Sequence, residues 1–221
     1  MSFWFITHPF QFKHPFNCQI VGPTMCGKTF LLKEILKYKS SIISKPPTNI
    51  IYCYKLWQPC YDEMKLNDKS IVFHEGLYDM SLLQAINTNL IILDDLMVEC
   101  NKSQDILNLF TVGTHHSNTS VFFLTQNIFS KGPVTRDISL NTKDLILFLN
   151  PRDQLQMQIL ARQAYGKNSK WLVDSFLDAT KKPYGYLHLN FSPETENRNR
   201  VQTGILPKDF DRIIYTSRES L

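Results

Sequence analysis

Short apolar runs rich in β-branched and aromatic residues recur along the chain, separated by helix-like or turn-like stretches. Such runs are typical of strands in a parallel sheet that is buried on both faces. They predict strands at Asn17–Val21, Asn49–Tyr54, Ser70–His74, Asn89–Asp94, Val121–Thr125, Asp144–Leu149 and Tyr184–Phe191.

Between these runs, apolar residues at helical spacing predict helices at Phe30–Tyr38, Leu82–Ile86, Asp105–Thr114 and Leu155–Tyr165. Asn150 and Pro151 are expected to start the last of these, as cap and first helical residue. The polar stretch from Ser192 to Gln202 is predicted to be an exposed loop. Strands and helices therefore alternate, and the predicted class is α/β with a mostly parallel central sheet flanked by helices.

The chain has 221 residues, enough for one α/β domain. We expect an aromatic N-terminal extension at 1–16, a core at 17–163, and a C-terminal strand, loop and tail at 164–221. Five cysteines form no C-x-x-C pair, and no signal peptide or membrane span is evident. These features predict an intracellular protein in a reducing compartment. The net charge of +4 permits contact with nucleic acid without demanding it.

The octapeptide at 22–29 matches the phosphate-binding P-loop pattern G-x-x-x-x-G-K-[ST], and it lies between a predicted strand and a predicted helix. It consists of Gly22, Pro23, Thr24, Met25, Cys26, Gly27, Lys28 and Thr29. The glycines let backbone N–H groups point at phosphate oxygens, assisted by the N-terminus of the following helix. Lys28 is expected to reach the β- and γ-phosphates, and Thr29 to offer its hydroxyl to Mg²⁺.

Paired carboxylates end the apolar run at 89–94. Ligands collect at the carboxyl ends of strands in open α/β sheets, so Asp94 is expected beside the P-loop as a ligand of Mg²⁺ or of its water. Asp95 could orient and deprotonate an attacking water. The alternative is a solvated turn after a core strand.

Two further predicted strands lie between Thr29 and Asp94. That count favours the P-loop division in which an additional strand intervenes and a carboxylate activates water, on the side of ATPases and motors. The base-reading pattern N-K-x-D of GTPases is also missing, since residues 101–104 read Asn-Lys-Ser-Gln. We therefore expect ATP as the nucleotide.

A strand that ends in a polar amide provides a third feature. Gln126 follows the apolar run at 121–125 and could contact a γ-phosphate oxygen or the attacking water, and so report the nucleotide state. A strand-terminal glutamine can equally be an ordinary turn residue.

Together, these motifs resemble the viral branch of the FtsK/HerA motor ATPases. The segments that carry the resemblance are GPTMCGKT, LIILDDLM, FFLTQN, TRDISLN, FLNPRD and LARQ, within residues 17–163. More narrowly, the chain is similar to the genome-packaging ATPases of Polinton (Maverick) and adintovirus-type elements, and more distantly to those of poxviruses. Cellular members usually carry Asp-Glu where this chain has Asp94-Asp95, so Asp95 is one methylene shorter than its counterpart.

The resemblance implies a RecA-like core that uses ATP and Mg²⁺, assembles into a homo-oligomeric ring and moves double-stranded DNA into a capsid. A capsid or portal-vertex protein is an expected partner, in the infected cell or in the virion. In such motors a neighbouring subunit commonly supplies an arginine to the transferred phosphoryl group. Arg136 is the first candidate and Arg152 the second. The candidate DNA contacts are Lys131, Lys181, Lys182, Arg198 and Arg200.

Other functions remain open at this stage. Another DNA-dependent ATPase is one alternative. A helicase would normally carry a second core or further motifs, for which there is no room, and a small nucleotide kinase would need an acceptor site and an arginine-rich lid, which does not stand out. A P-loop protein could also act as a slowly hydrolysing nucleotide-binding switch.

Overall fold

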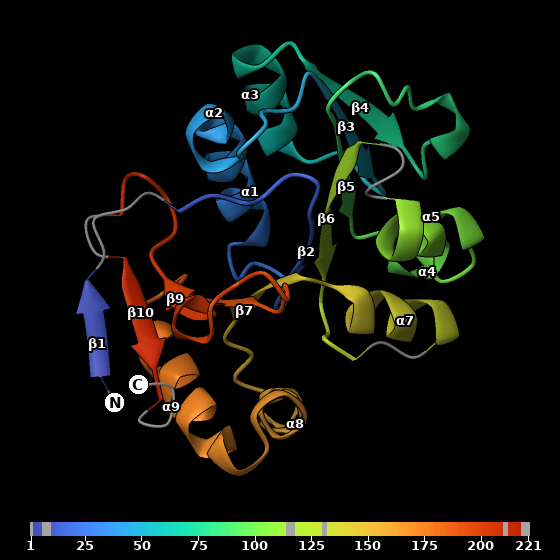
Figure 1. Cartoon of the computed structure of the whole chain (residues 1–221). Helices are drawn as coiled ribbons and strands as arrows, with labels where there is room; N and C mark the ends of the chain where they lie inside the picture. Colours follow the sequence, from blue (N-terminus) through green and yellow to red (C-terminus); the bar gives the residue numbers. More distant parts are fainter. Residues whose placement is uncertain (1, 6–9, 114–117, 130–131, 210–211, 218–221) are drawn as a thin grey trace.

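The computed structural model describes residues 2–5, 10–113, 118–129, 132–209 and 212–217 (Figure 1). Its strands are β1 (Ser2–Phe5), β2 (Asn17–Val21), β3 (Asn49–Tyr54), β4 (Ile71–Glu75), β5 (Asn89–Asp94), β6 (Thr119–Thr125), β7 (Asp144–Phe148), β8 (Tyr186–Asn190), β9 (Val201–Thr203) and β10 (Ile213–Thr216). Its α-helices are α1 (Lys28–Lys37), α2 (Lys39–Ile42), α3 (Pro59–Asn67), α4 (Met97–Cys100), α5 (Gln104–Asn108), α7 (Pro133–Asn141), α8 (Leu155–Tyr165) and α9 (Ser169–Ala179).

All ten of these strands form one sheet, in the order β1-β10-β9-β8-β7-β2-β6-β5-β3-β4. From β7 to β4 the neighbouring strands run parallel. Every residue of β2, β5, β6 and β7 is buried, which explains why these strands appear in the sequence as largely apolar runs. The predicted α/β class and mostly parallel sheet are confirmed.

The remaining neighbours, from β7 through β8, β9 and β10 to β1, run antiparallel. The prediction of a parallel strand at 184–191 was therefore wrong in direction. Two helices, α8 and α9, lie between β7 and β8, and the chain re-enters the sheet beside the end of β7, where Tyr186 pairs with Phe148. A strand that starts there can only run back along β7.

Helices cover both faces of the sheet (Figure 1). On one face, residues of α1, α2 and α3 pack with the sheet in a single core cluster, which also contains Phe10, Phe12 and Phe16. On the other face, α4, α5 and α7 lie against the β5–β6 half, and α8 and α9 lie against the β7–β8 half. These three aromatic residues of the N-terminal extension thus pack on the chain's own core. The side chains of residues 3–5 lie outside the description.

Several predicted elements differ in the structure. No helix spans Leu82–Ile86; a short 3-10 turn at Met80–Leu82 occurs instead, because the Asp79 carboxylate accepts a hydrogen bond from the N–H of Ser81. The helix expected at 105–114 is α5 followed by a π-helix at Leu109–Gly113, and Thr114 lies outside the described residues. The expected loop at 192–202 ends in β9, whose Val201 and Gln202 are buried.

The start of α8 also differs. The helix has the predicted bounds, but its N-cap is Gln154, and Asn150 does not cap it. The Asn150 side chain instead accepts a hydrogen bond from the N–H of Arg152, at 3.1 Å, and closes a separate turn. Asparagine often forms such local turns, which compete with helix initiation.

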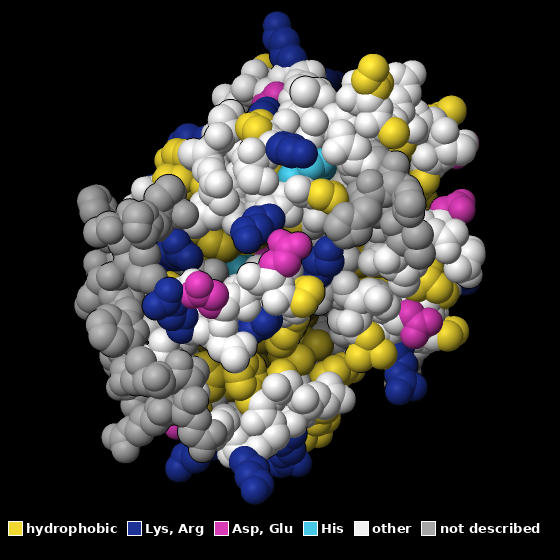
Figure 2. Space-filling model, in the orientation of Figure 1, with side chains coloured by type: hydrophobic (Ala, Val, Ile, Leu, Met, Phe, Trp, Pro, Cys, Tyr) yellow, Lys and Arg dark blue, Asp and Glu magenta, His cyan; other side chains and the backbone are white. Residues whose placement is uncertain are grey.

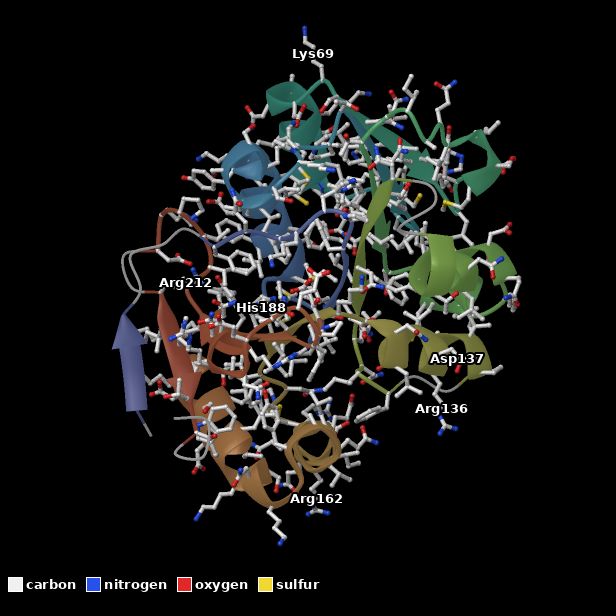
Figure 3. The ribbon with its side chains drawn as sticks, in the orientation of Figure 1. Lys69, Arg136, Asp137, Arg162, His188 and Arg212 are labelled. Carbon is white, nitrogen blue, oxygen red and sulfur yellow. The ribbon has the colours of Figure 1, made fainter. Side chains whose placement is uncertain are left out.

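A buried chain of polar side chains crosses the antiparallel strands and fixes their register. Two of its members, Arg212 and His188, are labelled in Figure 3. Arg212 donates from Nε to Oε1 of Gln202 at 2.8 Å, which turns the amide nitrogen of Gln202 toward Nδ1 of His188, 2.9 Å away. His188 therefore accepts at Nδ1 and donates from Nε2 to Asp144, at 2.8 Å. Because His188 and Gln202 are almost fully buried, a slip of one strand would leave several polar groups unpaired.

No helix in the described part of the chain is long and apolar enough to cross a membrane.

Candidate nucleotide-binding site

The P-loop leaves the end of β2 through a contact that only glycine allows. A Cβ at Gly22 would lie 2.6 Å from Sγ of Cys26 and 2.7 Å from Cβ of Phe148. The N–H of Gly22 donates to the carbonyl of Thr125 on β6, at 3.1 Å. At the other end of the loop, Gly27 has φ of 106°, in the left-handed region that glycine adopts without strain. The two glycines thus set both ends of the loop.

Helix α1 presents an uncapped N-terminus to this loop. Its N-cap is Gly27, no side chain accepts from the first N–H groups, and its first turn holds no acidic residue. The positive end of the helix is therefore uncompensated and suited to a phosphate. Lys28 donates to the carbonyls of Gly22 and Pro23, at 2.6 and 2.9 Å, which holds its ammonium over the loop.

Asp94 lies at the carboxyl end of β5, where its carboxylate is buried. Two phenol hydroxyls donate to the same oxygen, Oδ2: that of Tyr52 at 2.6 Å and that of Tyr61 at 2.9 Å. Burial raises the pKa of Asp94 above its ordinary value, against the opposing effects of the two phenol hydrogen bonds and of the Lys28 charge. Asp94 is therefore a core residue within electrostatic reach of Lys28, and the alternative of a solvated turn does not hold for it.

Asp95 and Gln126 lie together at the surface, one residue beyond the ends of β5 and β6. Nε2 of Gln126 lies 3.5 Å from Oδ1 of Asp95, at the outer limit of a hydrogen bond. Asp95 has φ of 57°, a left-handed conformation that non-glycine residues seldom adopt. The tight turn after β5 thus separates the two carboxylates, leaving Asp94 buried and Asp95 exposed.

The strand order determines how these groups surround the P-loop. β6 lies between β2, which carries the P-loop, and β5, which carries Asp94. The predicted additional-strand division is therefore confirmed. The intervening strand is the one that ends before Gln126; the two strands between Thr29 and Asp94 in sequence, β3 and β4, lie beyond β5.

The donor set fits a magnesium ion. Thr29 is half-buried at the start of α1, and in the described part of the chain no hydrogen-bond donor engages Oδ1 of Asp94. A hydroxyl and one free carboxylate oxygen are hard ligands of the kind that Mg²⁺ uses together with water and phosphate oxygens. Both residues could hold the ion as predicted.

A side chain that sequence reasoning missed lies on the other side of the P-loop. Tyr184 precedes β8 and has φ of 62°, and the residue is 71% exposed. A Cβ added at Gly27 would lie 3.1 Å from Cδ1 of Tyr184 and 3.6 Å from Cε1 of Phe148. An exposed aromatic ring is thus held against the phosphate loop, on the side away from Asp94.

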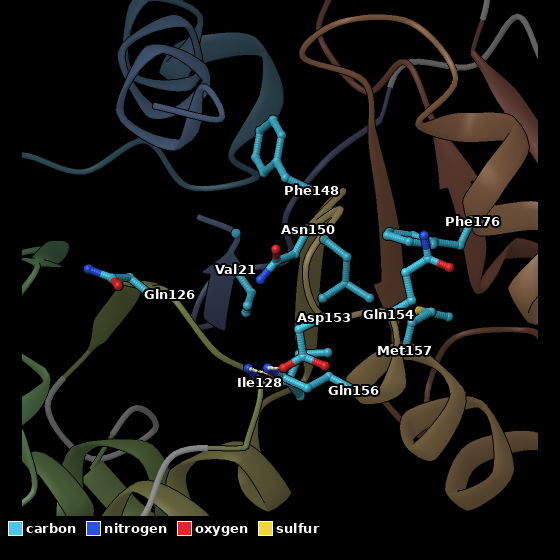
Figure 4. A pocket seen from close by; sticks show the side chains of 12 residues that line it. Val21, Gln126, Ile128, Phe148, Asn150, Asp153, Gln154, Gln156, Met157 and Phe176 are labelled. Carbon is cyan, nitrogen blue, oxygen red and sulfur yellow. Dashed lines mark hydrogen bonds between the residues drawn. The ribbon is translucent and has the colours of Figure 1, made fainter. Parts of the chain in front are cut away.

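A second missed residue, Gln156 on α8, connects this helix to the chain that leaves β6 (Figure 4). Its Oε1 accepts from the N–H of Ile128 at 2.7 Å, and its Nε2 donates to Oδ1 of Asn127 at 3.1 Å and to Asp153. Ile128, Asp153 and Gln156 line a pocket whose lining also includes Gly22 and Gln126. No local pattern could have indicated this contact, because 28 residues separate Gln156 from Ile128.

The two candidate arginines do not join the site within one chain. Arg136 is exposed on α7 and points away from the rest of the molecule (Figure 3). Arg152 is exposed in the turn after β7. Neither forms an ion pair with a described residue.

The chain matches no family model, and no curated protein is significantly similar to it. Its fold resembles that of solved structures of the genome packaging NTPase B204 from Sulfolobus turreted icosahedral virus 2. The complex with sulfate has a TM-score of 0.58 at 12% identity and covers 86% of this chain and 95% of that one. The complex with ATP-gammaS has a TM-score of 0.55 at 14% identity and covers 84% and 95%. At this identity the likeness shows the fold alone, which is that of a P-loop NTPase.

Replacing Lys28 tests the phosphate site. We expect Lys28→Ala to lose about a hundredfold in affinity for ATP, since charged hydrogen bonds to phosphate are worth about 1.5–3 kcal/mol. Calorimetric titration measures this. Lys37→Ala, at an exposed position of the same helix, is the control and should bind like the parent. Unchanged affinity in Lys28→Ala would remove the P-loop assignment.

Proposed function

We propose that this protein is an ATP-hydrolysing motor that moves double-stranded viral DNA into a capsid. The observation that carries the proposal is the convergence of Lys28, Asp94 and the Asp95–Gln126 pair at one edge of the sheet. A catalytic carboxylate and a polar sensor beside the P-loop are what a hydrolytic motor requires. Further support is the fold shared with B204, a genome packaging NTPase solved with ATP-gammaS and AMPPCP, and the motif set that resembles viral FtsK/HerA-type ATPases.

Each residue has a distinct role in this proposal. The loop amides and Lys28 bind the phosphates, and Thr29 and Asp94 hold Mg²⁺, which when bound neutralises charge on the β- and γ-phosphates. Asp95 is exposed and free to orient and deprotonate a water. Gln126, 3.5 Å from Asp95, is placed to contact the same water or the γ-phosphate.

The sheet order supports one direction for a bound nucleotide in this proposal. Asp94 and Gln126 follow β5 and β6, on one side of β2, and we infer that the γ-phosphate lies on that side. The base then extends toward β7 and β8, on the other side of β2, where Tyr184 presents its exposed ring. We infer that Tyr184 stacks on the adenine base.

Tyr184→Ala should weaken ATP binding about tenfold, because base–aromatic stacking contributes about 1–3 kcal/mol. Binding of inorganic tripolyphosphate, which has no base, should not change. Competition titrations with both ligands measure the difference, and Tyr184→Phe is the control that keeps the ring. Equal losses for ATP and tripolyphosphate would show that Tyr184 only supports the loop.

Contact with DNA is proposed through a ring of subunits. On the face shown in Figure 2, the Lys and Arg side chains of the described residues are scattered among acidic ones. Lys181 and Arg198 pair with Asp178 and Glu196, and Lys131 lies outside the described residues. A ring multiplies weak backbone contacts by the number of subunits, so a mildly basic monomer is sufficient.

Duplex-stimulated hydrolysis is the experiment that tests the proposed function. We expect long double-stranded DNA to raise steady-state ATP hydrolysis by the purified protein, and Asp95→Asn to lower hydrolysis by about two orders of magnitude, as for loss of a catalytic base. Asp174→Asn, an exposed position on α9, serves as the control.

Hydrolysis that is insensitive to DNA would contradict the motor. A rate unchanged by Asp95→Asn would instead favour a nucleotide-binding switch. Duplex unwinding without translocation would favour a helicase.

Arg136 is proposed to act on the neighbouring subunit. It shares the exposed side of α7 with Leu140, which is 70% exposed four residues further on, and such a face suits a subunit contact. Arg136→Ala should be inactive alone, yet regain part of its activity when mixed with Lys28→Ala subunits. In some interfaces of the mixed ring, an intact P-loop then faces an intact Arg136.

Hydrolysis by the mixtures measures this rescue, and light scattering confirms that mixed rings assemble. Arg162→Ala, at an exposed arginine on α8 (Figure 3), is the control and should be active alone. Assembled mixed rings without activity would exclude a trans role for Arg136. The same experiment with Arg152→Ala then tests the second candidate.

A further inference from the structure

The two tyrosines on Asp94 hold its carboxylate in an unusually defined way. Both hydroxyls donate to Oδ2, from Tyr52 on β3 and Tyr61 on α3, at 2.6 and 2.9 Å. We propose that Tyr52 and Tyr61 are positioning residues for the magnesium site: they hold Oδ2 of Asp94 in place, which would leave Oδ1 available to the ion or to its water. The inference rests on the proposed nucleotide site and needs neither DNA nor a ring.

The two hydrogen bonds restrict rotation of the Asp94 carboxylate about χ2. The carboxyl group of an aspartate turns about χ2 in a broad, roughly two-fold well, so an unrestrained carboxylate would exchange its two oxygens. Two donors that converge on Oδ2 from different elements oppose that rotation, because turning the group would break both bonds. Oδ1 then keeps a constant direction as the remaining acceptor.

The tyrosines are themselves rigid. Tyr52 and Tyr61 are 0% and 1% exposed, and their ring centroids lie 4.8 Å apart. Phe73 packs on both rings, at 5.1 Å from Tyr52 and 5.3 Å from Tyr61. Packing thus transmits the positions of β3 and α3 directly to the carboxylate.

A simpler role would be to satisfy a buried acid. In that case, loss of a hydroxyl would lower the stability of the fold but leave the response to magnesium unchanged. In the positioning role, the loss weakens the contribution of the ion to nucleotide binding, since residues that orient metal ligands typically affect metal affinity about 10–100-fold. The two roles therefore differ in a measurable quantity.

The chain offers a matched control. Tyr54 belongs to the same aromatic cluster, with its ring 5.7 Å from that of Tyr61 and 6.5 Å from that of Phe73. Unlike the other two tyrosines, it donates no hydrogen bond to Asp94. Tyr54→Phe therefore removes a hydroxyl from the cluster without touching the carboxylate.

The experiment measures the affinity for ATP-gammaS in EDTA and in saturating Mg²⁺, for the parent and for Tyr52→Phe, Tyr61→Phe and Tyr54→Phe. We expect the magnesium-dependent gain in affinity to fall about tenfold in Tyr52→Phe and in Tyr61→Phe, with affinity in EDTA unchanged. Tyr54→Phe should match the parent. Urea unfolding of each variant records stability separately, and Tyr61→Phe alone decides the matter if the fully buried Tyr52→Phe does not fold.

A magnesium-dependent gain equal to that of the parent in Tyr61→Phe would overturn the proposal, as would equal losses with and without the ion. A parent whose nucleotide affinity ignores magnesium would overturn both this inference and the metal site. Normal magnesium behaviour together with hydrolysis indifferent to DNA would contradict only the motor function.

Discussion

The close approach of three chain segments at the end of β2 is the constraint on which the site depends. Gly22 lies so near Cys26 and Phe148 that no side chain fits, and its N–H is bound to the carbonyl of Thr125. These contacts join the P-loop to β6 on one side and β7 on the other. Because both strands run parallel to β2, their carboxyl ends deliver Gln126 and Phe148 to the same edge. The position of the phosphate loop is therefore determined by its contacts with β6 and β7.

The parts of this arrangement that depend on neighbouring residues in the sequence are predictable, and the parts that depend on distant residues are not. The bounds of β2, β3 and β5 follow from local composition, since a strand buried on both faces is largely apolar. The P-loop is equally local. The tyrosines on Asp94 were not predictable, because they lie 42 and 33 residues away from it in sequence and only the pairing of β3 with β5 and the packing of α3 bring them close.

Two wrong predictions, of a helix cap at Asn150 and of a parallel strand at 184–191, have a related origin. Asparagine is a common helix cap, but the side chain of Asn150 accepts a hydrogen bond from the N–H of Arg152 and forms a local turn instead. The sequence alone does not decide between a cap and such a turn. The direction of β8 depends on where α8 and α9 return the chain, which is a property of tertiary packing. The proposed contact of Tyr184 with the base was not predictable, because a single tyrosine in a turn is informative only when the structure shows that it lies beside Gly27.

The same contacts connect the site to the rest of the molecule. The backbone that follows Gln126 is held by Gln156, which accepts from Ile128 and donates to Asn127. Any displacement of this backbone must either break two hydrogen bonds or carry α8 with it. On the other face of the sheet, Tyr61 connects Asp94 to α3 through a hydrogen bond to the carboxylate. Helices α8 and α3, on different faces of the sheet, are thus attached to the ends of β6 and β5. A displacement at these strand ends would therefore act on helices of both faces.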